Sequence, residues 1–251
     1  MARIIILGAG HAVPDLEHEN SHLLIEQGAH GVLVDCASNP ITQLKKAGVE
    51  LDQISDLILT HFHPDHVSGA PLLLMSMWLL GRKKLLRVYG LKTTMQSLHT
   101  LMDLYDWRNW PDFFPVEFID VTDQELSPVI DTPDLKIYST PVQHLIPTIG
   151  LRVEFFPEEK ILAYSCDTEP CEQVVRLAKG ADILLHEATG ASKGHSSALQ
   201  AVDIFTQAGA KQLYLIHYSA RGVELEKMME RVHQKTAFPV SLTHDLMKID
   251  L

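Results

Sequence analysis

The feature that most constrains this chain is a cluster of metal-binding side chains directly after a predicted β-strand. Four of them fall within six residues, in the segment Ile58-Leu59-Thr60-His61-Phe62-His63-Pro64-Asp65-His66. Imidazole nitrogens and carboxylate oxygens are good ligands for first-row metals. In an extended backbone His61 and His63 point the same way and can hold one ion together. Pro64 favours a turn, so Asp65 and His66 can face a second ion beside the first. The alternative is a solvated histidine-rich loop in which this spacing arose by chance, with a probability of roughly 0.3% for the whole chain.

Composition narrows the class of protein. The chain has 251 residues, of which 46% are hydrophobic and 21% are charged, as in an average globular protein. The longest apolar run, residues 70–80, is shorter than the about 20 residues needed to span a bilayer. The net charge of −11 argues against broad binding to nucleic acids or anionic membranes. The three cysteines form no CxxC pair, which is typical of a reducing cytoplasm.

Strand-like and helix-like segments alternate along the whole chain, without a linker or a short repeat. Strands are predicted at residues 4–7, 22–26, 32–36, 56–60, 86–89, 116–121, 135–139, 151–155, 161–164, 183–186, 212–216 and 247–251. Helices are predicted at residues 40–47, 67–80, 91–105, 170–178, 196–208 and 223–234. The front half is rich in hairpin-like strands, and the back half alternates strand and helix more regularly. The pattern predicts a layered α/β protein with a mixed sheet.

The spacing His61-X-His63-X-Asp65-His66 resembles the signature of the metallo-β-lactamase superfamily. Further metal positions of that superfamily match in order at His144, Asp167 and His217, each at a predicted strand end or in the loop that follows one. The resemblance covers essentially the whole chain. It implies a single domain over residues 1–251 with the αββα sandwich fold, which has two mixed sheets, helices on the outer faces and the site at one edge.

The resemblance also implies how the ligands divide. His61, His63 and His144 would hold the first metal, Asp65, His66 and His217 the second, and Asp167 would bridge them. Two divalent ions about 3.5–4 Å apart can share a hydroxide, which is the nucleophile, and can stabilise charge on the substrate. Asp65 could also orient that nucleophile or accept its proton. Zinc is the expected metal, with manganese or iron as alternatives, because imidazole and carboxylate suit all three.

Two later segments resemble the ribonuclease Z branch, the endonucleases that process the 3′ end of tRNA. They are Leu184-Leu185-His186-Glu187-Ala188-Thr189 and Gly194-His195-Ser196-Ser197-Ala198. In that branch a glutamate and a histidine from these loops pair beside the metals, here Glu187 and His195. A carboxylate can orient and charge an imidazole that donates a proton to the leaving oxygen. The alternative is a purely structural pair.

The chain departs from that branch in one large respect. Its members carry a long arm that grips tRNA after the strand that follows the third motif, whereas here only the acidic segment 154–160 precedes the next strand. Without an arm and with a charge of −11, tight binding of structured tRNA is not expected. Cys166 stands where glycine is usual. Arg221 is a candidate contact for an anionic substrate, with an ordinary surface arginine as the alternative.

The sequence therefore predicts a cytoplasmic, dinuclear metal hydrolase, with a small phosphodiester as the favoured substrate. Alternatives on the same site are an arylsulfatase, a lactonase or another ester hydrolase. A tRNA 3′ processing endonuclease and a non-enzymatic metal-binding or interaction module are further alternatives. The resemblance also implies a homodimer. Trp107 and Trp110 could form a wall of the substrate pocket, or could serve core or dimer packing.

Overall fold

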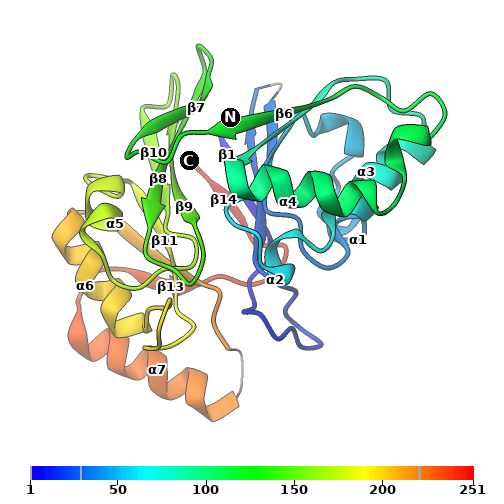
Figure 1. The fold of residues 1–251 in the computed structure, drawn as a ribbon. Helices are drawn as coiled ribbons and strands as arrows, with labels where there is room; N and C mark the ends of the chain where they lie inside the picture. Colours follow the sequence, from blue (N-terminus) through cyan, green and yellow to red (C-terminus); the bar gives the residue numbers. More distant parts are fainter. Residues whose placement is uncertain (1, 29, 220–221) are drawn as a thin grey trace.

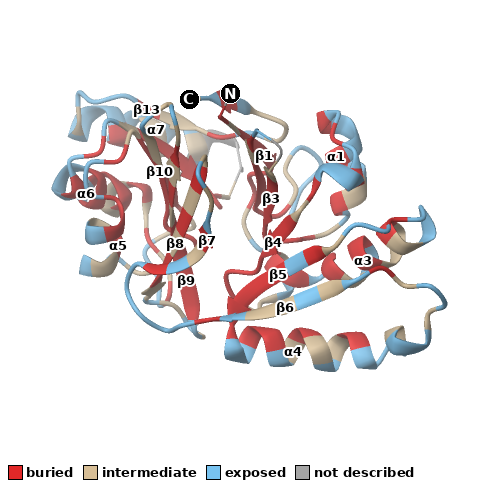
Figure 2. Cartoon of the chain, turned by 90° about the horizontal axis from the view of Figure 1, so that it is seen from above, coloured by how far each residue is buried: buried red, intermediate tan, exposed pale blue. Residues whose placement is uncertain are grey.

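Two seven-stranded mixed sheets lie face to face in the computed structural model, with helices on both outer sides (Figure 1). The structure describes residues 2–28, 30–219 and 222–251. Seen from above, α5, α6 and α7 cover the outer side of one sheet, and α1, α3 and α4 cover the outer side of the other (Figure 2). Among the described residues, no helix has the length and apolar character needed to cross a membrane.

The first sheet has the strand order β14-β1-β2-β3-β4-β5-β6. Its antiparallel part contains β14, β1, β2 and β3, and β4, β5 and β6 continue it in parallel from β3. The strands are β1 (Arg3–Gly8), β2 (His22–Gln27), β3 (His30–Val34), β4 (Asp56–Ile58), β5 (Leu86–Leu91), β6 (Val116–Val121) and β14 (Lys248–Asp250). The helices of this half are α1 (Pro40–Ala47), α2 (Pro64–Val67), α3 (Ala70–Leu79) and α4 (Lys92–Asp103), with short 3-10 turns η1 (Leu51–Gln53) and η2 (Trp107–Asn109).

The second sheet has the order β13-β12-β11-β10-β9-β8-β7 and the same division. Its first four strands in the chain pair antiparallel, and β11, β12 and β13 extend the sheet in parallel from β10. The strands are β7 (Ser127–Asp131), β8 (Leu135–Val142), β9 (Thr148–Phe155), β10 (Lys160–Tyr164), β11 (Ile183–Glu187), β12 (Gln212–Ile216) and β13 (Val240–Leu242). The helices are α5 (Glu172–Leu177), α6 (Ala198–Ala208) and α7 (Gly222–Lys235).

The strands are apolar on both faces because each sheet has a core on both sides. In β1, Ile4 and Ile6 belong to the cluster that fills the space between the sheets, and Ile5 and Leu7 pack beneath the helices of the first sheet. This alternation is the period-2 geometry of a strand buried on both sides. The sheets are therefore fixed against each other, which allows loops from both to form one site.

The structure corrects two details of the expected fold. Each sheet contains an antiparallel and a parallel part, so the contrast expected between the front and back halves of the chain is wrong. The helix expected at residues 67–80 is interrupted at Gly69, whose amide donates to the carbonyl of Cys36 at 2.8 Å. A Cβ at Gly69 would lie 2.9 Å from the same carbonyl oxygen, so only glycine permits this close approach.

The connection between β9 and β10 is short. Residues 156–159 join the two strands, and the amide of Phe156 donates to the carbonyl of Asp134 at 2.9 Å. Glu158 lies in this connection and accepts a hydrogen bond from Gln27. The position where the ribonuclease Z arm was predicted to be missing therefore holds a tight hairpin connection.

Candidate metal centre

The structure brings all seven predicted ligands together at one edge of the sandwich. Four of them, His61, His63, Asp65 and His66, follow β4 of the first sheet. The other three follow strands of the second sheet: His144 follows β8, Asp167 follows β10 and His217 follows β12. The carboxyl ends of parallel strands meet at one edge, which is where α/β proteins usually place their sites. The two sheets therefore contribute complementary halves of one cluster.

Local backbone geometry explains how neighbouring ligands converge. His63 has an extended backbone and is the N-cap of α2, and Pro64 takes its first position. Proline suits this position because its fixed φ fits the helix and its missing N–H is not needed there. Pro64 thus starts a helical turn that carries Asp65 and His66. That turn, rather than a non-helical bend, directs the two side chains to the same cluster.

The first group of ligands consists of three histidines. The Nε2 of His61 and the Nε2 of His144 each lie 3.1 Å from the Nδ1 of His63. All three nitrogens lie within 4.8 Å of one another, so one ion could be bound between them. His61 is fully buried, whereas His63 is partly exposed, so this group opens to solvent on the His63 side.

The second group contains two carboxylates and two histidines. The Oδ2 of Asp65 lies 3.4 Å from the Nε2 of His217 and 3.6 Å from the Nε2 of His66. The Oδ2 of Asp167 lies 3.5 Å from each of the same two nitrogens, and 4.0 Å from the Nε2 of His144 in the first group. Asp167 is therefore the carboxylate between the two groups, which is the position expected of a bridging ligand.

Unpartnered buried atoms show that the cluster suits cations. The Nε2 of His66 and the Oδ1 of Asp167 are buried and have no hydrogen-bond partner. Buried polar atoms normally have one, so these two atoms require a ligand. Three histidines also have Nδ1 fixed by an oxygen: His66 by Asp35 at 2.7 Å, His144 by the carbonyl of Gly194 at 2.6 Å and His217 by Thr189 at 2.7 Å. With Nδ1 donating, each Nε2 presents its lone pair to the centre.

Without a bound cation, the electrostatics of the centre favour a charged Asp167, neutral imidazoles at His61 and His144 and a protonated His66. Burial lowers the pKa of His61 and of His144, so both stay neutral, as metal ligands must be. Burial alone would raise the pKa of Asp167, but His217 and His66 outweigh it and hold that pKa well below its usual range. Conversely, Asp167 and Asp35 outweigh burial at His66 and raise its pKa well above normal. The charged carboxylate of Asp167 attracts a cation to this buried cluster.

The backbone around the centre is strained at three positions. Asp35, Cys166 and His217 have left-handed φ angles of 61°, 52° and 54°. Non-glycine residues adopt this region at a cost of order 1–3 kcal/mol, and such residues cluster at functional sites. A left-handed backbone favours glycine, which agrees with the glycine that the resemblance implies at the position of Cys166. Asp35 uses its unusual geometry to accept from the amide of Thr60 at 2.8 Å as well as from His66.

Glu187 and His195 form the predicted pair beside this cluster. The Nδ1 of His195 lies 3.0 Å from Oε1 of Glu187 and 3.9 Å from Oδ2 of Asp167. Glu187 is fully buried, and its carboxylate also accepts from the amides of Thr168, Thr189 and Ser196. The hydrogen bond to Glu187 is the main cause that raises the pKa of His195 above its ordinary value. His195 is partly exposed, so its ring can meet a substrate.

Sequence reasoning missed two of the groups that orient the ligands. Thr189 is the last residue of the segment with Glu187, and its hydroxyl contacts both Nδ1 and the carbonyl of His217. Gly194 has a φ of +82°, and a Cβ there would lie 3.0 Å from Nδ1 of His144. Their position in the ribonuclease Z-like segments was the available signal.

Three further predicted residues remain, Arg221, Trp107 and Trp110. Arg221 lies outside the residues that the structure describes. Trp110 stacks on Trp78, with ring centroids 5.0 Å apart, and Trp107 packs edge-on against Phe113. Both tryptophans pack at the margin of the core beneath the helices of the first sheet. These contacts favour the packing alternative for this segment.

Comparison with proteins of known sequence supports the resemblance. The ribonuclease Z of Ignicoccus hospitalis is 30% identical, with 99% of this chain and 98% of the relative covered. The ribonuclease Z of Methanothermobacter thermautotrophicus is 27% identical, with 100% and 97% covered. The first alignment runs over 301 positions against 251 residues here, so that relative carries segments that this chain lacks.

Solved structures confirm the fold. The metallo-β-lactamase fold protein YhfI from Bacillus subtilis has a TM-score of 0.83 and 20% identity, with 99% of this chain and 98% of that chain covered. Human tRNase Z, short form, has a TM-score of 0.79 and 23% identity over 99% and 98%. The predicted αββα sandwich is therefore confirmed.

A family profile also matches the chain. The profile described as "Anti-Pycsar protein Apyc1" matches residues 2–238, which is nearly the whole sequence. The match includes every ligand of the candidate metal centre and the Glu187–His195 pair. Together with the ribonuclease Z relatives and the shared fold, it shows that the chain belongs to the Anti-Pycsar protein Apyc1 family, a ribonuclease Z-like branch of the metallo-β-lactamase fold.

Proposed function

We propose that this protein is a dinuclear metal-dependent phosphodiesterase that acts on small phosphodiesters. The observation that carries the proposal is the Glu187–His195 pair beside a seven-ligand cluster, with Nδ1 of His195 3.0 Å from Glu187 and 3.9 Å from Asp167. The ribonuclease Z relatives and the fold support a metal-dependent hydrolase. The pair adds a proton donor, which the expulsion of an alcohol from a phosphodiester requires.

The protein residues divide into three roles. His61, His63 and His144 would hold one ion, Asp65, His66 and His217 the other, and Asp167 both. Divalent ions would supply Lewis-acid chemistry here, activating water and stabilising negative charge on the phosphate. Asp65 is 13% exposed at its side chain and can orient the attacking water.

His195 would complete the reaction as the general acid. Glu187 holds the imidazole in one orientation and favours its charged form, because an imidazolium next to a buried carboxylate is stabilised. From its partly exposed position His195 would donate a proton to the leaving oxygen, and solvent would then reprotonate the imidazole.

Charge and shape favour a small substrate over a structured nucleic acid. The chain carries a net charge of −11, and a tight connection occupies the place of the tRNA-binding arm. Affinity for a polyphosphate backbone depends on many Lys and Arg contacts, and an acidic surface opposes them. A compact diester needs only the metal centre and a few neighbouring groups.

The test is hydrolysis of bis(p-nitrophenyl) phosphate compared with p-nitrophenyl sulfate, a lactone and a carboxylic ester. Chelator-stripped protein is reloaded with zinc or manganese, and His63→Ala serves as the blank. We expect turnover of the diester that depends on the metal and on His63. Activity on the sulfate or lactone without diester turnover would overturn the proposal but leave the metal centre in place. A cyclic nucleotide and a short RNA then narrow the substrate, and tight, salt-sensitive tRNA binding would favour tRNA processing.

Four further inferences accompany this proposal. We infer zinc as the resident metal, from the predominance of imidazole ligands. We infer that residues 1–251 act as one domain, because both sheets contribute ligands. A homodimer is supported by exposed apolar side chains near the ends of α3 and α4, namely Leu79, Leu80, Leu104 and Tyr105. A reducing cytoplasm is supported by Cys36, Cys166 and Cys171, which are all free thiols.

A further inference from the structure

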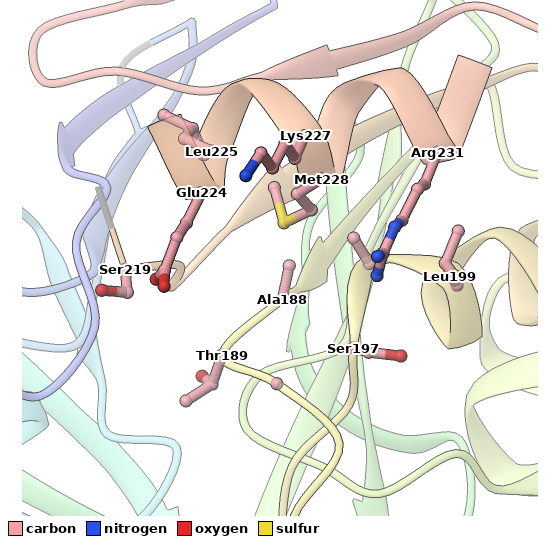
Figure 3. A pocket seen from close by; sticks show the side chains of 12 residues that line it. Ala188, Thr189, Ser197, Leu199, Ser219, Glu224, Leu225, Lys227, Met228 and Arg231 are labelled. Atoms are coloured by element: carbon pink, nitrogen blue, oxygen red, sulfur yellow. The ribbon is translucent and has the colours of Figure 1, made fainter. Parts of the chain in front are cut away.

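A hollow of about 490 Å³ lies between the start of α6, the loop after β11 and the first turns of α7. We call it the α6–α7 hollow. Its middle is apolar and contains Ala188, Leu225 and Met228. Figure 3 shows Thr189 and Ser197 on the wall opposite α7, with Met228 between the walls. The hollow is large enough for a group the size of a nucleoside, and it lies outside the metal cluster itself.

The α6–α7 hollow begins at a residue that also belongs to the metal centre. Thr189 lines the hollow, and its hydroxyl holds Nδ1 of His217 at 2.7 Å. Ser219, two residues after His217, lines the same side of the hollow. The amide of Thr189 donates to Glu187, the partner of His195. Thr189 therefore lies between the hollow and His217, so the hollow adjoins the metal centre.

The outer side of the hollow carries two cations from one helix. Lys227 and Arg231 lie one turn apart on α7, and both line the hollow. Like charges at this spacing destabilise a helix unless an anion neutralises them. Among the described residues, neither side chain forms a hydrogen bond or an ion pair. By contrast, Lys235 of the same helix pairs with Asp203 at 2.6 Å.

The acidic residues of α7 do not neutralise the charges of Lys227 and Arg231. Glu226 and Glu230 do not line the hollow. Glu224 does, but Figure 3 places it beside Ser219, at the opposite end from Arg231. The hollow is thus polar and acidic near Ser219 and apolar in the middle, with Lys227 above the apolar part and Arg231 at the end opposite Glu224.

We propose that the α6–α7 hollow is a second anion subsite, which recognises a further phosphate on the retained alcohol of the substrate through Lys227 and Arg231. This inference rests on the proposed phosphodiesterase function. The scissile phosphate lies at the metal centre, the sugar-sized group lies against Met228, and the second phosphate meets the two cations. The preferred substrates are diesters of a phosphorylated nucleoside. Glu224 accepts hydrogen bonds from hydroxyl or N–H groups of the middle part.

The test compares two substrates with the same leaving group. They are thymidine 5′-(p-nitrophenyl phosphate) and its 3′-phosphorylated form, both assayed with the metal-loaded protein. A charge-assisted contact to the added phosphate should lower KM about tenfold, the equivalent of about 1.4 kcal/mol. Lys227→Met and Arg231→Met should each remove most of that advantage. Lys179→Met, at an exposed lysine outside the hollow, should keep it. Equal KM values for the two substrates, or an advantage that survives both substitutions, would overturn the proposal.

A binding measurement separates this inference from the proposed function. Calorimetry compares thymidine 3′,5′-bisphosphate with thymidine 5′-monophosphate on the same four proteins. If neither nitrophenyl diester is hydrolysed, the phosphodiesterase proposal fails. The subsite is still supported if the bisphosphate binds about tenfold more tightly and loses this advantage in Arg231→Met. If both nucleotides bind equally to every protein, the subsite is wrong whatever the activity.

Discussion

Nδ1 of His195 lies 3.0 Å from Oε1 of Glu187, and the same carboxylate oxygen accepts from the amides of Thr168 and Ser196. The amide of Thr189 donates to the other oxygen, Oε2, so three amides hold Glu187 independently of the histidine. A buried carboxylate fixed in this way cannot follow a moving imidazole, so it determines where the ring of His195 lies. The pair is a rigid proton donor next to the candidate metal centre.

Replacing His195 should reduce turnover in a way that depends on the leaving group. We expect His195→Ala to lower kcat by about 10²–10⁴-fold for an alcohol leaving group, because general acid catalysis is worth that much. With p-nitrophenolate, which leaves without a proton, the loss should be much smaller. The measurement is kcat across a series of diesters with increasing leaving-group pKa. A uniform loss across the series would show that His195 has another role.

The pH profile of kcat should have an alkaline limb set by His195. Its pKa is raised by Glu187, and the acid form that donates the proton is lost as the pH rises through that pKa. Glu187→Gln removes the charge that raises the pKa, so the alkaline limb should move to lower pH. Profiles of kcat for the wild type and Glu187→Gln check this. An unchanged limb would assign it to a different group.

Chelation should destabilise the protein, and reloading should release protons. Without a cation, Asp167 and Asp35 raise the pKa of His66, so a metal that takes its Nε2 must displace a proton. We expect the melting temperature to fall by several degrees on treatment with a chelator and to recover with zinc. Calorimetry of zinc binding in buffers of different ionisation enthalpy would count the protons. Identical melting with and without metal would favour a non-enzymatic module.

Asp35 should control metal affinity without being a ligand. Its Oδ2 accepts from Nδ1 of His66 at 2.7 Å, whereas an asparagine amide there would favour the tautomer with the proton on Nε2. We expect Asp35→Asn to weaken metal binding by about 10–100-fold. Asp56→Asn is the matched control, because Asp56 is also a buried aspartate of the first sheet but bonds Ser55 and Tyr89 instead. Equal metal affinity in the two variants would remove Asp35 from this role.

Asp182 should contribute stability that depends on pH, away from the site. Burial raises its pKa, but bonds from Lys211 at 2.8 Å and the amide of Ile161 at 2.9 Å outweigh burial, so the net shift is downward. A depressed folded pKa gives stability above the unfolded pKa, and this stability is lost as the pH falls through the folded value. We expect Asp182→Asn to cost about 1–2 kcal/mol at pH 7 and progressively less as the pH falls below about 4.

Urea unfolding of the wild type and of Asp182→Asn, at pH 7 and at a pH below about 4, measures this difference in the free energy of unfolding. Asp203→Asn, at an exposed partner of Lys235, serves as the control with a small effect at either pH. A difference between wild type and Asp182→Asn that stays constant with pH would show that the carboxylate charge is not the cause.

Backbone periodicity predicted that His61 and His63 point the same way, as residues two apart in a strand do. The resemblance to the metallo-β-lactamase superfamily supplied His144, Asp167 and His217, each of which follows a strand that a local apolar run reveals. Strand β7 was missed because Pro128 lies within it, and proline is tolerated only at a sheet edge, which only the tertiary structure defines. The break at Gly69 depends on the carbonyl of Cys36, a contact that no local pattern encodes.

Groups that act through backbone atoms could not be predicted from the sequence either. The carbonyl of Gly194 fixes His144 from 50 positions away along the chain, and any residue type supplies a carbonyl. The α6–α7 hollow likewise forms between segments that are far apart in the sequence. The sequence shows Lys227 and Arg231 at the spacing of one helical turn. Only the packed structure shows that this face of α7 lines a hollow.

The division of the candidate ligands between the two sheets has a consequence for how the chain assembles. His61, His63, Asp65 and His66 come from one sheet and His144, Asp167 and His217 from the other, so neither half of the chain holds a complete set. A cation bound by ligands from both sheets would cross-link the sandwich. Its binding would therefore indicate that the two sheets have packed together. Metal uptake during refolding should thus be a late event, timed by the meeting of two surfaces rather than by the formation of either.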